Sequence, residues 1–264
     1  ARASKTMVDI LQGYGSVPDP RLTLILSKSQ AWVQGKDGSE EWKGVPNGLP
    51  VTELSLPEYD NNHNSCIWGY MWGYDWNSAE KGDNISKPQT DADFTPLGLM
   101  NYSEVCFLKA EAALRGWQGA GDAKTNYENG IHASFEEMRA NAPKDSYSKS
   151  NDDKYISEGN VAWNNADSFE AKLEKIITQK WIGIYPNSEE AWAEFRRTGY
   201  PKLNPVKQSL EPTINSKNGE FIKKLRYVDN ELSNNKEYAT DPTLNGGQGD
   251  GLSVRVWWDT ARYK

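Results

Sequence analysis

The fold is decided by residues 168–203, SFEAKLEKIITQKWIGIYPNSEEAWAEFRRTGYPKL, which carry start and stop signals for two consecutive helices. Asp167, with a glutamate three residues later, forms the capping-box pattern that opens a helix. Pro186 ends that helix, because proline lacks a backbone N–H and disfavours a helical residue before it. Asn187 then caps the second helix, and Gly199 suits the left-handed position beyond its end.

The first of these helices has one apolar face. Its apolar residues recur at the spacing of three and four that places side chains on one side of an α-helix: Phe169, Leu173, Ile176, Ile177, Trp181 and Ile184. The charged residues of both helices fall on the other faces, where acidic side chains usually form a solvated surface. We therefore expect the hairpin 167–199 to be structural and to contain no site residue.

A second helical hairpin is predicted over residues 99–140. Asn101, with a glutamate three residues later, gives another capping-box pattern, and Gly116 ends the first helix. The second helix presents an apolar face made of Ala123, Tyr127, Ile131, Ser134, Phe135 and Met138. The spacing around Gly130 resembles the second helix of a tetratricopeptide repeat, in which small residues allow two helices to pack closely.

Three stretches lack helical periodicity. Residues 30–98, 141–166 and 204–250 are rich in Gly, Pro, Asn and Asp, and we predict polar or irregular loops there. A loop as long as 30–98 within a compact domain is usually functional or disordered, and its many aromatic residues argue against disorder. We therefore treat residues 30–98 as a long, aromatic-rich loop insertion.

The two ends of the chain carry weaker patterns. Residues 1–29 predict a short helix, a turn and a second apolar piece in which Leu22, Leu24 and Leu26 alternate, as in a short strand or an extended approach to the core. Residues 252–259 also alternate, and we expect an extended tail that packs back onto the helices. The sequence thus predicts a single, mainly α domain over residues 1–264, with tetratricopeptide-like hairpins, long irregular loops and few short strands.

Composition excludes some classes of function. The 264 residues include 37 acidic and 30 basic side chains, for a net charge of -7, and no basic patch for nucleic acid stands out. No apolar run is long enough to span a membrane. The chain begins without an initiator methionine or a signal peptide, so we expect a processed or truncated product. A missing targeting signal is then no argument for the cytoplasm.

The cysteines and histidines predict no metal site and no cofactor. Cys66 and Cys106 are the only two cysteines, too few for a disulfide framework or for a zinc site without further ligands. Cys106 lies among apolar neighbours and is expected to be a buried thiol. His63 and His132 lie far apart without partners at metal spacing, and we expect His132 to be a packing residue.

The segment CIWGYMWGYDWN, residues 66–77, is the sharpest local signal for function. Aromatic side chains occupy every second position and would share one face of an extended segment. Such a face suits stacking on the apolar face of a sugar ring, and flanking Asn and Asp side chains can bind the hydroxyls. We expect the ligand-binding residues to be Tyr59, Asn62, Trp68, Tyr70, Trp72, Tyr74 and Trp76.

Two alternatives stay open at this point. The aromatic rings could instead pin the long loop to the helical core, with their N–H and O–H groups bound to the backbone. Paired carboxylates would suit a glycosidase, and the candidates are Glu189, Glu190 and Glu194, or Asp152 and Asp153. With 37 acidic residues such pairs arise by chance, and the sequence contains no G-x-S-x-G, H-E-x-x-H or P-loop motif.

The helical segments together resemble the SusD/RagB family. LMNYSEVCFLKAEAALRGW (99–117) and GDAKTNYENGIHASFEEM (121–138) are similar to its helical core. QKWI, EEAWAEFRRTGYP and RVWWD occur in matching order, and the resemblance extends to DPRL (19–22), to GVPNGL (44–49) and to the spacing of Tyr227, Glu231 and Asn234. The chain departs from the family pattern at Val228, where a proline is expected.

This resemblance implies a nutrient-binding lipoprotein on the outer face of an outer membrane. Such proteins are not enzymes; they cap a SusC-like TonB-dependent transporter and pass glycans or peptides to it. The present chain would be the C-terminal part, held to the membrane only through a lipid anchor outside these residues. The alternatives are a helical glycoside hydrolase fragment and a tetratricopeptide-type scaffold that binds a peptide.

Overall fold

The computed structural model describes residues 2–67, 98–140, 142 and 147–259. The longer helices are α1 (Lys5–Gly13), α5 (Tyr102–Leu114), α6 (Ala123–Arg139), α8 (Phe169–Gly183) and α9 (Ser188–Thr198). The shorter ones are α2 (Leu22–Ile25), α3 (Gln30–Val33), α4 (Val51–Leu54), η1 (Pro57–Tyr59), α7 (Asp152–Ser157), η3 (Ser216–Asn218), α10 (Asp229–Asn234), α11 (Lys236–Ala239) and α12 (Leu244–Gly247). Within the described ranges, β-structure is limited to two isolated bridges, so the mainly α fold is confirmed.

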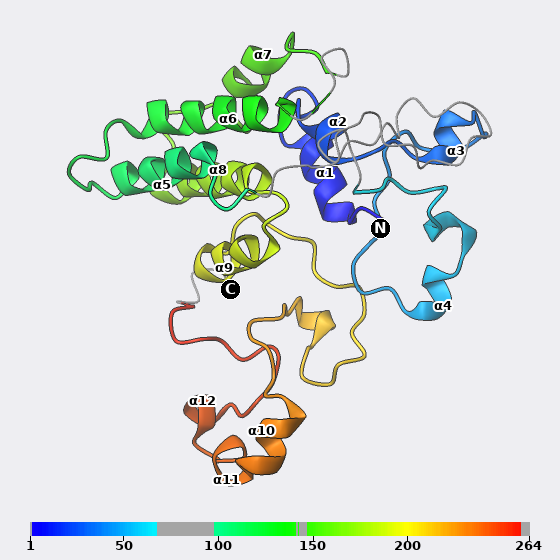
Figure 1. Ribbon diagram of the computed structural model, residues 1–264, viewed down its shortest axis with the longest axis vertical. Coiled ribbons are helices and arrows are strands. Elements are labelled where there is room, and N and C mark those ends of the chain that lie inside the picture. Colours follow the sequence, from blue (N-terminus) through cyan, green and yellow to red (C-terminus); the bar gives the residue numbers. More distant parts are fainter. Residues whose placement is uncertain (1, 68–97, 141, 143–146, 260–264) are drawn as a thin grey trace.

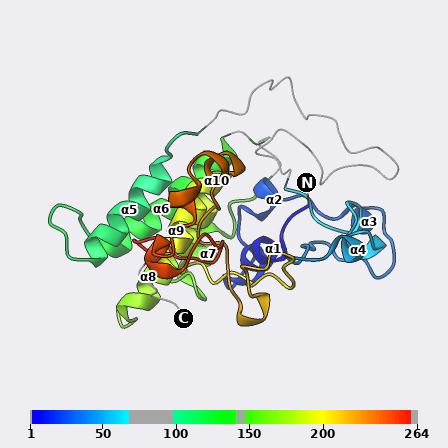
Figure 2. The same ribbon diagram turned by 90° about the horizontal axis from the view of Figure 1, so that it is seen from below.

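Helices α5, α6, α8 and α9 gather into one bundle, and α3 and α4 lie apart from it (Figures 1 and 2). We refer to residues 27–67, which include α3, α4 and η1, as the α3–α4 lobe. Helix α5 packs against α6 and α8, and α9 packs against α8. The bundle core is made of fully buried apolar side chains from α5, α6 and α8: Phe107, Ala110, Tyr127, Ile131, Phe135, Leu173, Ile176 and Ile177.

Gly130 sets the close approach of α5 and α6. A Cβ atom at Gly130 would lie 2.7 Å from Cε1 of the Phe107 ring, closer than real Cβ contacts come. The ring therefore occupies the space that any side chain at this position would need. This contact confirms the tetratricopeptide-like packing predicted from the spacing around Gly130.

Gly130→Ala is expected to destabilise the protein by about 1 kcal/mol, because overpacking outweighs the better helix propensity of alanine. The melting temperature should fall by about 2–4 °C. Gly13→Ala is the matched control, since nothing lies within 4 Å of a Cβ atom there. Thermal melts followed by circular dichroism make the comparison. Equal melting temperatures for the two variants would show that Phe107 accommodates the added methyl group.

The hairpin of α8 and α9 forms as predicted, with one shift at its start. Ser168, not Asp167, is the N-cap of α8, and its Oγ accepts a hydrogen bond from the Ala171 N–H at 3.2 Å. The predicted cap at Asp167 is therefore wrong by one residue. The Asp167 carboxylate instead pairs with Lys175 Nζ at 2.7 Å, about two turns into the helix.

The start and end of α9 are confirmed. The Asn187 side chain accepts from the Glu190 N–H at 3.2 Å, and Gly199 adopts a left-handed φ of 81°. At the start of α5, Asn101 has the extended backbone of an N-cap but makes no side-chain capping bond. The carboxylate of Glu137 on α6 accepts the Ser103 N–H instead, so a tertiary contact replaces the local cap.

Two predictions for segments outside the two helical hairpins are wrong. The segment with Leu22 forms the short helix α2 rather than a strand. Leu24, Ile25 and Leu26 are buried at three consecutive positions, so the alternation of the leucines carried no information about a sheet face. The predicted loop 141–166 contains α7, because Tyr155 is fully buried and Asp152 pairs with Arg139 at 2.6 Å.

A buried polar cluster connects α2 to the bundle. The Arg21 guanidinium is fully buried and donates to Asp19 Oδ2 and to Gln179 Oε1, both at 2.6 Å. It also donates to Ser134 Oγ at 3.1 Å. Asp19 Oδ2 accepts a further bond from the Tyr155 hydroxyl at 2.6 Å. One buried ion pair thus joins the segment before α2 to α6, α7 and α8.

The predicted loop 204–250 is largely irregular and contains the short elements η3, α10, α11 and α12. The tail 252–259 packs back onto α9, as predicted. The guanidinium of Arg196 lies 3.6 Å from the Trp192 ring centroid and 4.7 Å from that of Trp258. The Arg196 guanidinium therefore stacks on both indole rings and attaches the tail to α9.

The cysteine prediction is confirmed for Cys106, a buried free thiol, and Cys66 is likewise buried and free. His132 differs from the expectation. Its side chain is exposed on α6 and touches the bundle only through an edge contact with Phe135, at 6.4 Å between ring centroids.

Candidate functional site

The structure describes two of the seven predicted ligand-binding residues. Tyr59 ends η1 and is half-buried, and its carbonyl oxygen accepts a hydrogen bond from Arg2. Asn62 is exposed, and its carbonyl oxygen accepts the Ala31 N–H at 2.8 Å. The other five lie outside the described residues: Trp68, Tyr70, Trp72, Tyr74 and Trp76. Both described residues therefore lie in the α3–α4 lobe, directly before the aromatic run.

The loop that carries these two residues is held by its own side chains. Asn64 is buried, and its amide donates to the carbonyl oxygens of Glu58 and Asp60, both at 2.9 Å. The Asp60 carboxylate accepts from the His63 backbone N–H and lies 2.8 Å from His63 Nδ1. Because three side chains bridge the loop, Asn62 has a fixed position on the lobe surface.

Both ends of segment 68–97 attach to the same end of the bundle. At the first end, the hydroxyl of Tyr185, just after α8, donates to the Ile67 carbonyl oxygen at 3.1 Å. The chain enters the described part again just before α5. The start of α5 lies beside the end of α8, because Lys180 Nζ is 3.6 Å from Glu104 Oε1. The described residues that flank segment 68–97 are thus close to one end of the helical bundle.

Trp32 is a candidate binding residue that the sequence reasoning missed. Its side chain is 40% exposed on α3, and Lys28 Nζ lies 4.7 Å from the ring centroid. The neighbouring Ala31 N–H binds the Asn62 carbonyl oxygen, so Trp32 and Asn62 share one surface of the lobe. Trp32 has no aromatic neighbours at a regular spacing, so the sequence alone does not tell whether its ring is exposed or buried.

Among the cavities lined by residues of this lobe, two differ clearly in chemistry. The polar one, of about 530 Å³, is lined in part by Arg2, Asn47 and Asn61. The apolar one, of about 720 Å³, is lined mainly by aliphatic and aromatic side chains that include Phe195 and Phe221. Sugar hydroxyls lose free energy when they are buried without hydrogen-bond partners. The polar cavity therefore suits a sugar better than the apolar one does.

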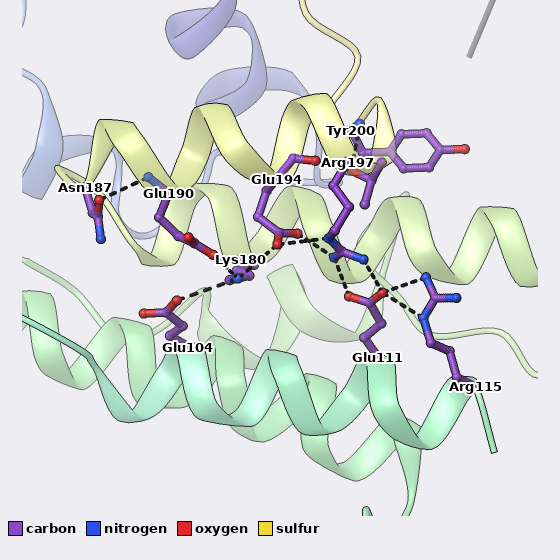
Figure 3. Close-up of polar contacts among 10 residues, drawn as sticks. Glu104, Glu111, Arg115, Lys180, Asn187, Glu190, Glu194, Arg197 and Tyr200 are labelled. Atoms are coloured by element: carbon purple, nitrogen blue, oxygen red, sulfur yellow. Dashed lines mark hydrogen bonds and ion pairs between the residues drawn. The ribbon is translucent and has the colours of Figure 1, made fainter. Parts of the chain in front are cut away.

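A cluster of acidic and basic side chains joins α5, α8 and α9 (Figure 3). Lys180 Nζ is almost fully buried and lies 2.8 Å from Glu190, 3.4 Å from Glu194 and 3.6 Å from Glu104. The expectation that the acids of this hairpin form a solvated face is wrong for Glu194, which is buried. The reason is that α9 faces α5 and α8 through its charged side rather than through a purely apolar one.

The second half of this cluster is centred on Arg197. Its guanidinium donates to both carboxylate oxygens of Glu111, at 2.7 and 2.6 Å, and to Glu194 at 2.7 Å. Burial alone would raise the pKa of Glu111, but hydrogen bonds and charge from Arg197 and Arg115 outweigh it and hold the pKa below its ordinary value. A general acid for glycoside hydrolysis needs a raised pKa instead.

Three of the candidate glycosidase carboxylates are engaged in ion pairs. Glu190 pairs with Lys180, Glu194 pairs with Lys180 and Arg197, and both oxygens of Asp152 accept from Arg139, at 2.6 and 2.7 Å. These ion pairs hold helices together.

The depressed pKa of Glu111 predicts a loss of stability in acid. The folded state prefers ionised Glu111, so this contribution is present above the ordinary pKa of 4.5 and is lost as pH falls through the lower folded value. We expect the melting temperature to fall between about pH 5 and pH 3, and less steeply in Glu111→Gln. Glu158→Gln, at an exposed position, is the control. Identical slopes in the two variants would contradict this role of Glu111.

The described residues contain neither a metal-binding cluster nor a membrane-spanning helix. They contain no group of three His, Cys, Asp or Glu side chains that could hold a metal ion. None of their helices is both long enough and apolar enough to cross a membrane.

Comparisons with known proteins agree on one family. The family described as SusD-like, Susd and RagB outer membrane lipoprotein, matches residues 1–259. A chitin-binding SusD homologue from Flavobacterium johnsoniae is 32% identical, with a TM-score of 0.68 over 98% of this chain and 49% of that one. SusD homologues from Bacteroides ovatus and Bacteroides vulgatus are 30% and 28% identical, each with a TM-score of 0.70, over 98% and 100% of this chain and 52% and 50% of theirs.

No curated protein matches the sequence. The chain spans about half the length of the solved structures that it matches. The family match nevertheless extends over almost every residue, and the order of the helices is that of the matched structures. The chain belongs to the SusD-like family of outer membrane lipoproteins.

Proposed function

We propose that this chain binds a glycan on its α3–α4 lobe and the adjoining aromatic run, does not cleave it, and serves its delivery to a TonB-dependent transporter at the cell surface. The observation that carries this proposal is the 32% identity to a chitin-binding SusD homologue over 98% of the chain. Chitin is accordingly the first glycan to test.

Recognition would combine stacking with hydrogen bonds. The exposed ring of Trp32 and the predicted rings of Trp68, Trp72 and Trp76 offer flat apolar faces for sugar rings. The exposed Asn62 side chain and the polar cavity beside the lobe offer partners for hydroxyl groups. Because the Asn64 bonds fix the loop, the free energy of ordering it on binding is small.

The absence of cleavage is supported by the state of the acidic residues. Three of the carboxylates that suited a glycosidase form ion pairs with cations of the helical bundle. A protein that only binds needs no carboxylate with a raised pKa. The proposal therefore expects binding of a polysaccharide without release of reducing ends.

Binding is best measured by native affinity electrophoresis with soluble glycans and by pull-down with chitin. Trp32→Ala, Trp68→Ala, Trp72→Ala and Trp76→Ala are each expected to weaken binding by about 2–10-fold, as the loss of one stacked ring does. Trp257→Ala is the matched control, because Trp257 is 94% exposed on the tail next to α9. Its affinity should equal that of the unchanged chain.

Far-ultraviolet circular dichroism separates this proposal from its alternative. The tryptophan variants should keep the helical signal of the unchanged chain. If Trp68→Ala, Trp72→Ala and Trp76→Ala lose that signal, their rings belong to the core and the site lies elsewhere. Delivery is tested separately, by co-purification of the full-length gene product with a SusC-like transporter from outer membranes.

A further inference from the structure

A further cavity lies between the α3–α4 lobe and helices α1, α2 and α7. Its volume is about 410 Å³, within the range of roughly 300–1,000 Å³ that holds small ligands. Gln12 lines it from α1, Pro18 and Pro20 from the segment before α2, Trp42 from the lobe and Asn151 from the start of α7. We call it the α2–α7 cavity.

The lining of the α2–α7 cavity mixes apolar and polar groups. Pro18, Pro20 and Trp42 offer apolar surface, and Gln12 and Asn151 offer side-chain amides. A sugar needs both, because its C–H faces pack on apolar surface while its hydroxyl groups need hydrogen-bond partners. The chemistry of the lining therefore suits a sugar unit.

Trp42 provides a hydrogen-bond donor that the protein leaves unused. The residue is 9% exposed and belongs to the apolar cluster around α1 and α2. A buried indole N–H usually donates to a protein acceptor. Within the described ranges no residue accepts a hydrogen bond from Trp42, and its nitrogen is not sealed from solvent. Because the residue lines the cavity, this N–H is available to a ligand there.

The two side-chain amides are available in the same way. Asn151 is the N-cap residue of α7, a position at which asparagine usually accepts a hydrogen bond from the helix, yet its side chain makes no capping bond. Gln12 is exposed at the end of α1. Neither amide is hydrogen-bonded to another of the described residues. An amide carries both donors and an acceptor, so these two can bind hydroxyl groups in either sense.

The charged residues in the lining are all paired. Asp19 Oδ2 lies 2.6 Å from Arg21, and Lys28 Nζ lies 2.8 Å from Glu41 Oε1. An ionised ligand would find no unpaired opposite charge there to offset the loss of its hydration. Asp19 also accepts from the Tyr155 hydroxyl at 2.6 Å, and all three residues of this group are buried, so this wall is in place before a ligand binds. A neutral ligand fits best.

Lys28 connects the α2–α7 cavity to Trp32. It lines the cavity, and its Nζ lies 4.7 Å from the centroid of the Trp32 ring. We propose that the α2–α7 cavity is a second sugar-binding subsite, which holds one unit of a neutral oligosaccharide while further units lie on Trp32. This inference rests on the proposed function and adds to it the class of glycan and a dependence on glycan length.

Trp42→Phe tests the subsite, because it removes the indole N–H and keeps an aromatic ring. In isothermal titration calorimetry the variant should bind the chitin hexasaccharide about 2–10-fold more weakly than the unchanged chain does, as expected for the loss of one hydrogen bond. Binding of the chitin disaccharide, which can occupy Trp32 alone, should change by less than about twofold. Trp163→Phe is the matched control, because the Trp163 N–H already donates to Asn165 Oδ1 at 3.0 Å.

Asn151→Ala keeps the test independent of the packing of Trp42. Asn151 is exposed and makes no capping bond, so its truncation should leave the melting temperature unchanged. It should weaken binding of the hexasaccharide within the same range as Trp42→Phe. Asn129→Ala, at an exposed position of α6, is the control and should bind like the unchanged chain. Thermal melts show that each variant is folded at the temperature of the titration.

The outcomes separate the subsite from the proposed function. Equal hexasaccharide affinities for the unchanged chain, Trp42→Phe and Asn151→Ala would overturn the subsite, whereas weaker binding by Trp32→Ala in the same series would still support the proposed function. A loss of affinity in the control variants as large as in their partners would also overturn the subsite. An unchanged chain that binds no glycan would refute both. Tighter binding of polygalacturonate than of any neutral glycan would contradict the neutral class of ligand.

Discussion

Arg21→Met is expected to lower the melting temperature more than any other single change considered for this chain. Methionine fills much of the space but leaves the fully buried Asp19 carboxylate without its cation. Removing one partner of a buried ion pair costs about 3–5 kcal/mol, which corresponds to a fall on the order of 10 °C. The loss should appear in thermal melts at neutral pH.

Two further variants show whether the stranded charge is the cause. Arg21→Met combined with Asp19→Asn removes the buried charge while keeping the shape, and it should be more stable than Arg21→Met alone. Arg226→Met is the control for a loss of charge, because Arg226 is half exposed and lies 3.8 Å from its partner Glu211. A melting temperature of Arg21→Met within about 2 °C of the unchanged chain would contradict the account.

Lys180→Met has the second largest expected effect. Lys180 is the one cation shared by Glu104, Glu190 and Glu194, which come from α5 and α9. Burial alone would lower the pKa of Lys180, but the three carboxylates raise it above its ordinary value, so the ammonium form stabilises the fold. Without it, carboxylates repel one another in a partly buried site, and we expect a loss of about 3 kcal/mol.

The loss in Lys180→Met should depend on pH. Because the raised pKa of Lys180 stabilises the fold below its ordinary value of 10.5, the difference in melting temperature from the unchanged chain should shrink as pH rises above that value. Lys5→Met is the control, because its pair with Asp9 is solvent-exposed and contributes little. If both lysine variants melt alike at pH 7, the cluster in Figure 3 does not hold α9 to the bundle.

The sequence predicted the two hairpins because their signals are local. Capping residues, the prolines and glycines that end helices and the apolar spacing act within one or two turns, so α5, α6, α8 and α9 could be placed within a few residues. Helix α7 was missed because the contacts that stabilise it come from residues far away in the sequence. Tyr155 is buried and donates a hydrogen bond to Asp19, 136 residues away, and such contacts leave no periodic pattern in the sequence.

The buried charges were missed for a related reason. Arg21 and Lys180 look like surface residues in the sequence, since charged side chains are almost never fully buried unless they are paired. Their partners come from other elements, and only the folded chain brings them together. Trp32 was missed in the same way, because the contact of Ala31 with Asn62 places it on the lobe surface.

The candidate site was predicted in part. The structure places Tyr59 and Asn62 in the lobe that leads into the aromatic run, and the described residues that flank segment 68–97 lie near one end of the bundle. The role of the five aromatic residues within that segment remains a prediction from their alternation.

The most direct test of the central claim is affinity electrophoresis of this chain in gels that contain a panel of soluble glycans, with soluble chitin derivatives first. The account predicts retarded migration with at least one glycan, reduced retardation for Trp32→Ala and Trp72→Ala but not for Trp257→Ala, and no release of reducing ends. Release of reducing ends, or equal retardation of all three variants, would contradict it.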